Sequence, residues 1–140
     1  MKSHVGAIGV MQVMPATGKN LAVGDITRIE PNVHAGVKYC RFMMDQFYED
    51  GPVDAPNKGL MTLASYNAGP ARIRQLRIET ARRGRDPNVW FGTSSAWCPS
   101  GWPGDVQYVS NIHKYYIAYR LVFDRRHARE RAMASPKKNS

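Results

Sequence analysis

The fold class is decided by the stretch between residues 32 and 52, which reads NVHAGVKYCRFMMDQFYEDGP. Apolar side chains recur in this stretch in steps of four and three, the spacing that places residues on one face of an α-helix. These side chains are Val33, Val37, Cys40, Met44 and Phe47. Asn32 is suited to cap the start of the helix, and Gly51-Pro52 to end it. The stretch therefore predicts a helix whose apolar face packs inward.

The same spacing predicts three further helices. The first begins after Pro56-Asn57 and ends near Asn67, the second begins at Pro70, and the third runs from about Asp105 to the Arg125 region. Their expected inward positions are Leu60, Leu63 and Ala64, then Ile73 and Leu76, and finally Val109, Ile112, Tyr116, Tyr119 and Phe123. Because no segment alternates apolar and polar residues for long, we expect an all-α fold. One domain should cover residues 3–125, followed by a basic tail at 126–140.

Composition fits one folded domain. The chain has 140 residues, of which 43% are hydrophobic and 22% charged. These fractions are ordinary for globular proteins and exclude a mainly disordered or coiled-coil chain. No apolar run approaches the roughly 20 residues of a membrane-spanning helix. The net charge of +9 favours anionic partners such as nucleic acid, acidic wall polymer or a membrane surface.

The cysteine and tryptophan positions leave alternatives open. Cys40 and Cys98 lack the spacing of a metal site, and they could form a disulfide or remain two thiols. Three tryptophans lie in the loop before the last helix, where they could stack on a sugar or form a small satellite core; the second is favoured, because exposed indoles are costly. They are Trp90, Trp97 and Trp102. Tyr115, Tyr116 and Tyr119 are expected in the core rather than as a sugar platform.

Two segments are more particular than helical spacing requires. Residues 3–17 read SHVGAIGVMQVMPAT, with two glycines three apart and Gln12 in an apolar run. Residues 66–70 read YNAGP, which places an aromatic hydroxyl and an amide at a helix end. Taken alone, the first could be a buried helix and the second an ordinary helix C-terminus.

Together with NVHAGVKY at 32–39 and YVSNI at 108–112, these segments resemble the lytic transglycosylases of the soluble type. The resemblance implies a single lysozyme-like helical domain of the goose-lysozyme type. It also implies a periplasmic or cell-envelope location and the glycan strand of peptidoglycan as substrate. The family cuts between N-acetylmuramic acid and N-acetylglucosamine without hydrolysis, and it leaves a 1,6-anhydro product. No cofactor, metal or specific nucleic acid is implied, and no oligomeric state is assigned.

The resemblance also implies site residues. Ser3 would hydrogen-bond the catalytic Glu, Gln12 and Met14 would line the cleft, and Tyr108 would close its opposite wall. Tyr66 and Asn67 would hold the sugar at the point of scission. The substrate-binding candidates are thus Ser3, Gln12, Met14, Tyr66, Asn67 and Tyr108.

The family's catalytic glutamate has no counterpart in this chain, so no catalytic residue is assigned. In the family a Glu-Ser pair stands about nine residues before the position that matches Ser3. In this sequence the position of that pair falls before Met1. We therefore expect a domain that lacks its first helix and signal peptide. Three origins of this loss stay open: the piece of the gene that was cloned, the assigned start codon, or a truncation of the gene itself. Four acids are the candidates in its place, Glu30, Glu49, Asp50 and Glu79, and they have the pattern of helix-end or ion-paired surface groups.

Three functions compete at this point. The chain is part of an active transglycosylase, a glycan-binding remnant without catalysis, or a basic nucleic-acid binder. The third is disfavoured, because arginine clusters such as those at 72–85 and 125–131 are usually solvated and also suit anionic envelope surfaces.

Overall fold

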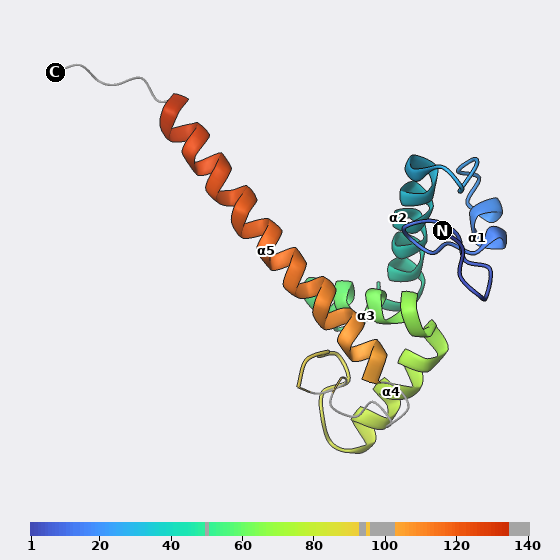
Figure 1. Ribbon diagram of the computed structural model, residues 1–140. Coiled ribbons are helices and arrows are strands. Elements are labelled where there is room, and N and C mark those ends of the chain that lie inside the picture. Colours follow the sequence, from blue (N-terminus) through green and yellow to red (C-terminus); the bar gives the residue numbers. More distant parts are fainter. Residues whose placement is uncertain (50, 93–94, 96–102, 135–140) are drawn as a thin grey trace.

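The chain folds into five helices in the part that the structure describes. The computed structural model describes residues 1–49, 51–92, 95 and 103–134. These residues form no strand, only isolated bridges that pair Ile8 with Lys2 and with Val13. The expected all-α fold is confirmed (Figure 1). The helices are α1 (Pro15–Asn20), α2 (Ile29–Tyr48), α3 (Ala55–Ala68), α4 (Pro70–Arg82) and α5 (Pro103–Ala134).

Helix α2 forms where the sequence predicts it, but the expected inward face is wrong. The helix begins at Ile29, so Asn32 lies inside it rather than at its cap. Val33, Val37 and Phe47 are exposed, Val37 by 57%. The buried positions are Asn32, Ala35, Gly36, Met43 and Tyr48.

The reason for this rotation is the close approach of the N-terminal segment to α2. A Cβ at Gly36 would lie 2.5 Å from Cε of Met11, so only a glycine allows the two segments to touch there. The first half of α2 therefore packs through the small residues Ala35 and Gly36, and the larger Val33 and Val37 stay exposed.

Helices α3 and α4 form where they are predicted, but α3 begins at Ala55 and not after Pro56-Asn57. The Asp54 carboxylate accepts a hydrogen bond from the backbone N–H of Asn57 and caps α3. Gly69, with φ of 89°, makes the turn between the two helices, a conformation that L-residues rarely adopt. The expected core positions of both helices are buried, apart from Leu63, which is partly buried. They are Leu60, Ala64, Ile73 and Leu76.

The main core joins the end of α2 to α3, α4 and the start of α5. Trp90 is fully buried in this core, together with Met61 and Val109. Its backbone N–H donates to the side-chain oxygen of Asn57 on α3. The expected satellite core is therefore wrong for Trp90, which belongs to the main one. Trp97, Trp102 and Cys98 lie outside the described residues, so the question of a disulfide with Cys40 is not decided.

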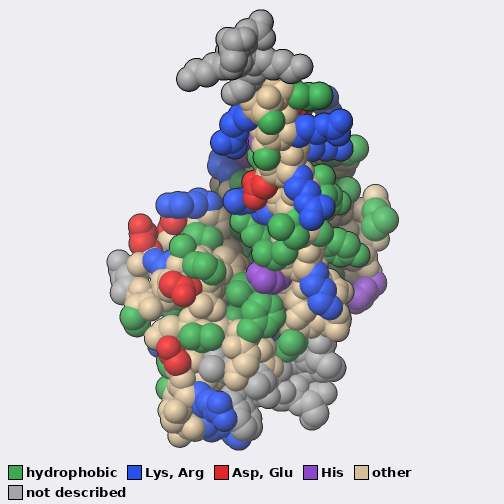
Figure 2. All heavy atoms as spheres, turned by 90° about the vertical axis from the view of Figure 1, so that its left-hand side faces the viewer, with side chains coloured by type: hydrophobic (Ala, Val, Ile, Leu, Met, Phe, Trp, Pro, Cys, Tyr) green, Lys and Arg blue, Asp and Glu red, His purple; other side chains and the backbone are tan. Residues whose placement is uncertain are grey.

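Helix α5 is longer than expected, and its outer half extends away from the body (Figure 1). Val109 is buried near its start, where α5 packs on α3. Tyr115, Tyr116 and Tyr119 are all more than half exposed, and Tyr119 by 73%. Assigning them to the core is therefore wrong: their helical spacing continues the inward face of α5 beyond the point where α3 covers it. Figure 2 shows hydrophobic side chains along this helix with Lys and Arg among them.

The boundary expected at residue 126 falls inside α5, which continues without interruption to Ala134. The division into a domain at 3–125 and a tail at 126–140 stays a prediction. No helix among the described residues is both long and apolar enough to cross a membrane.

Candidate functional site

The N-terminal segment at residues 6–14 is a tight loop and not the buried helix that was one alternative for it. Ile8 and Val13 exchange both backbone hydrogen bonds, each 2.9 Å long. Gly9 and Gln12 between them have positive φ values of 76° and 49°. A Cβ at Gly9 would lie 2.4 Å from the Asn32 side chain, so glycine is required there by space as well as by conformation.

Asn32 attaches this loop to α2. Its side-chain oxygen accepts from the Met11 N–H at 2.9 Å, and its amide nitrogen donates to the carbonyls of Ile8 and Ile26 at 2.8 and 2.9 Å. The side chain is fully buried, so these bonds replace those it would make to water. A second small core of Val13, Ile26 and Ala35 lies beside it. The loop is thereby held in one conformation against α2.

Tyr66 joins the loop to the end of α3. Its hydroxyl donates a 2.6 Å hydrogen bond to the Met11 carbonyl, across 55 residues of sequence. Its ring meets the Tyr39 ring of α2 edge-on, with 5.7 Å between centroids. The two most particular segments of the sequence therefore meet in space, next to Gln12.

Tyrosines 39, 66 and 108 form what we call the tyrosine cluster. Burial raises the pKa of Tyr66 to about 12, with smaller contributions from Cys40, Tyr108 and Tyr39. Burial also raises the pKa of Tyr108, with a further contribution from Cys40, and burial alone raises that of the Cys40 thiol. Each of these groups therefore favours its uncharged form. The cluster presents neutral aromatic and hydroxyl groups, which suit an uncharged, hydroxyl-rich ligand such as a sugar.

The raised pKa of Tyr66 predicts a loss of stability at high pH. Because the pKa rises from an ordinary 10 to about 12, the stabilisation is complete below pH 10 and is lost as the pH rises toward 12. For this half-buried group we expect a loss of about 1–2 kcal/mol over that window. Denaturant unfolding at several pH values should show a smaller loss in Tyr66→Phe than in the unchanged chain, where the raised pKa values of Tyr108 and Cys40 add to that of Tyr66. Tyr115→Phe, at an exposed tyrosine, should retain the full pH dependence; an equal reduction in both variants would contradict the prediction.

The remaining predicted site residues lie mainly on the loop. The Ser3 hydroxyl accepts from the Ala7 N–H at 3.0 Å, within its own turn. Gln12 is exposed, and its amide donates to the Gly9 carbonyl at 2.7 Å. Met14 is exposed directly before α1, and Asn67 is exposed beside Tyr66. The structure connects Tyr66 to Met11, the neighbour of Gln12, and Tyr108 acts on Tyr66 electrostatically. The Ser3 hydroxyl bonds instead to Ala7, four residues away along the chain.

Sequence reasoning missed two residues of this region. Asn32 was interpreted as a helix cap, and Tyr39 was quoted in a motif without a role. The available signal was that both stand in the NVHAGVKY segment, seven residues apart, which is two helical turns. Only the structure shows that one holds the loop and the other contacts Tyr66.

The described carboxylates do not provide a buried acid. Glu30 and Glu49 are exposed at the two ends of α2, and Glu79 pairs with Arg83 at 2.7 Å. The Asp25 pKa is lowered by hydrogen bonds from Thr27. Asp50 lies outside the described residues. In the described part of the chain no three His, Cys, Asp or Glu side chains come together as a metal site would need.

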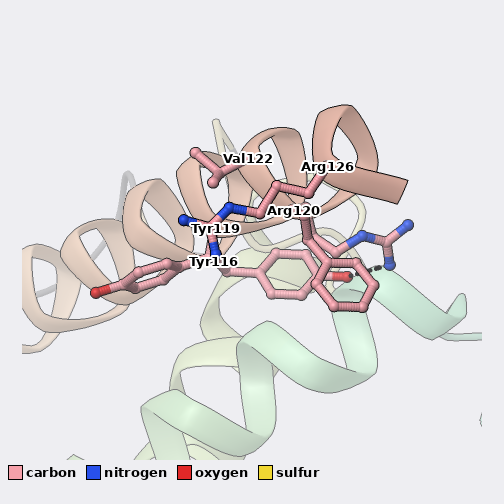
Figure 3. A pocket seen from close by; sticks show the side chains of 6 residues that line it. Tyr116, Tyr119, Arg120, Val122 and Arg126 are labelled. Carbon is pink, nitrogen blue, oxygen red and sulfur yellow. Dashed lines mark hydrogen bonds between the residues drawn. The ribbon is translucent and has the colours of Figure 1, made fainter. Parts of the chain in front are cut away.

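Three cavities in the described part of the molecule lie away from the tyrosine cluster. One of about 450 Å³ lies along the outer half of α5, where Arg120 donates to the Tyr116 hydroxyl at 3.3 Å (Figure 3). Another, of about 470 Å³, lies between α3 and α5. A third, of about 630 Å³, lies between the end of α2 and α4.

Comparison with known proteins gives a consistent match. Residues 1–88 match the family described as the transglycosylase SLT domain. The chain is similar to membrane-bound lytic murein transglycosylase F of Desulfosudis oleivorans, with 35% identity over 89 residues, 64% of this chain and 19% of that protein. It is also similar to the protein of the same name from Pseudoalteromonas translucida, with 27% identity over 131 residues, 84% of this chain and 27% of that protein. The chain spans about a fifth to a quarter of the length of these relatives.

Proposed function

Because the chain belongs to the transglycosylase SLT domain family, we propose that it binds the glycan strand of peptidoglycan across the tyrosine cluster and the adjoining loop. The observation that carries this proposal is the hydrogen bond from the Tyr66 hydroxyl to the Met11 carbonyl. It brings together the two segments on which the resemblance to lytic transglycosylases is most specific. The proposed location is the periplasm or cell envelope.

Each binding residue has a role in this proposal. Tyr66 and Asn67 hold the sugar at the scissile bond, since Tyr66 bonds to the loop and Asn67 is the exposed next residue in the last turn of α3. Gln12 and Met14 are exposed on the loop and line the muramoyl side. The full set is Ser3, Gln12, Met14, Tyr66, Asn67 and Tyr108.

The proposed reaction of the complete enzyme is an intramolecular transfer. The 6-hydroxyl oxygen of N-acetylmuramic acid bonds to its own anomeric carbon, while the bond from that carbon to the N-acetylglucosamine oxygen breaks. A carboxylic acid protonates the departing oxygen and, as carboxylate, takes the proton of the 6-hydroxyl. The product is a 1,6-anhydro sugar, and the tyrosine cluster contributes a wall of uncharged groups that positions the sugar.

A glycan-binding domain without catalysis is the second candidate. It is favoured by the described carboxylates, whose side chains are exposed or paired with arginine. In this form the chain holds the strand, and cleavage requires an acid from elsewhere.

The test is binding of a neutral chitooligosaccharide, measured by isothermal titration calorimetry. A neutral ligand is needed because any surface with a net charge of +9 attracts anionic polymers. We expect binding, and we expect Asn67→Ala to weaken it about tenfold, the effect of losing one hydrogen bond of about 1.4 kcal/mol. Gln46→Ala, at an exposed position of α2 outside the site, should bind like the unchanged chain.

Absence of measurable sugar binding by the folded chain would overturn the proposal. An equal loss of sugar affinity in Asn67→Ala and Gln46→Ala would show that the binding site is not at the tyrosine cluster. Circular dichroism of each variant establishes that it is folded.

A further inference from the structure

A cavity rich in arginine lies outside the tyrosine cluster, between the end of α2 and the first three turns of α4. It measures about 630 Å³, the largest of the three described above. One wall carries Phe47 and Tyr48 of α2, and the other carries Ile78 with three arginines of α4. The arginines are Arg72, Arg74 and Arg77. We call this cavity the arginine pocket.

Charge in the arginine pocket is of one sign. Among the described residues that line it there is no Asp or Glu. The acid of α4, Glu79, pairs instead with Arg83 at 2.7 Å, outside the pocket lining. The guanidinium groups of Arg74 and Arg77, three residues apart on one helix, repel each other unless an anion lies between them. The pocket therefore favours an anionic ligand on Coulomb grounds alone.

Arg77 is fixed in place before any ligand binds. Its Nε donates to the Pro87 carbonyl at 3.0 Å and its Nη2 to the Asn88 side-chain oxygen at 2.7 Å. The guanidinium also lies over the Tyr48 ring, 5.7 Å from its centroid. A guanidinium held in this way loses little conformational entropy on binding, and its remaining N–H groups still point outward from the same plane.

The apolar part of the lining restricts the ligand further. Phe47 is 47% exposed and Ile78 is 44% exposed, so a molecule in the pocket covers apolar as well as charged surface. A free inorganic ion gains only from the charges, whereas an anionic group on a chain with small apolar substituents gains from both.

We propose that the arginine pocket binds an oxyanion, carboxylate or phosphate, carried on such a chain, with Arg74 and Arg77 as its ligands. The source of the oxyanion rests on the proposed function: a polymer of the envelope supplies it, either as a carboxylate of the peptides attached to peptidoglycan or as a phosphate of an anionic wall polymer. The site is separate from the tyrosine cluster, so one strand can bind through its sugar at one and through its charged substituent at the other.

The experiment compares three probes on the 140-residue chain by isothermal titration calorimetry. They are a peptidoglycan disaccharide-peptide with free carboxylates, the same molecule with its carboxylates converted to amides, and glycerol phosphate. If the ligand is a carboxylate, the first probe should bind at least tenfold more tightly than the second, because charge-assisted pairing is lost on amidation. If it is a phosphate, glycerol phosphate should bind and the two disaccharide-peptides should not differ.

Matched charge variants locate the site. Arg74→Gln should weaken the anionic probe about tenfold, whereas Arg82→Gln, which removes the same charge from the exposed end of α4, should change it less than twofold. Equal effects of the two variants, or no difference between free and amidated probe together with no glycerol phosphate binding, overturn the proposal. Neutral chitooligosaccharide binding should be unchanged in Arg74→Gln, so that failure of the arginine pocket and failure of the proposed function give different results.

Discussion

Replacing Asn32 with alanine is expected to destabilise the chain by about 3 kcal/mol, one of the largest effects available to a single substitution here. The change leaves the Met11 N–H and the Ile26 carbonyl without the partner that the fully buried Asn32 side chain provides. The Ile8 carbonyl loses one of its two hydrogen bonds and keeps the one from the Val13 N–H. An unsatisfied buried backbone group costs about 1–3 kcal/mol, and partial entry of water reduces the sum for these two groups. The loop should detach from α2 and take the Met11 carbonyl away from Tyr66.

Urea unfolding followed by circular dichroism measures this loss. Asn20→Ala, at an exposed position of α1, is the matched control and should stay within about 0.5 kcal/mol of the unchanged chain. Sugar binding should fall together with stability in Asn32→Ala, because the loop forms one side of the proposed site. A variant that is as stable as Asn20→Ala would show that Asn32 does not hold the loop.

The second large effect concerns catalysis. The 140-residue chain by itself is expected to release no 1,6-anhydro sugar from peptidoglycan, since no described carboxylate is buried beside the tyrosine cluster. General acid–base catalysis contributes about 10²–10⁴ in rate, so a polypeptide extended upstream to carry a Glu-Ser motif should exceed the chain by at least that factor. Mass spectrometry of the soluble products measures both rates.

Binding of neutral chitooligosaccharide is the control, because it should be the same for the short and the extended polypeptide. Formation of 1,6-anhydro sugars by the 140-residue chain would contradict the expectation. In that case Glu30→Gln is the first substitution to make, with Glu79→Gln, at an ion-paired surface position, as its control.

The sequence predicted which segments contribute to the candidate site, but it did not predict how their residues contact one another. Tyr66, Gln12 and Tyr108 were all named from motifs. The contact between Tyr66 and Met11 spans 55 residues, and periodicity within a helix carries no information about such a distance. The arginine pocket was likewise visible only as a run of charge at 72–85, which by itself is typical of a solvated surface.

Sequence by itself determined the approximate positions of α2, α3, α4 and α5 and the turn between α3 and α4, because spacing, Pro70 and Gly69 act locally along the chain. The short helix α1 was not predicted. The tertiary structure decided which face of α2 is buried and how far α5 is covered. In α2 the close approach of Met11 to Gly36 outweighs the larger apolar residues Val33 and Val37. In α5 the apolar spacing continues beyond α3, and a side chain loses its contact with water only where another element covers it.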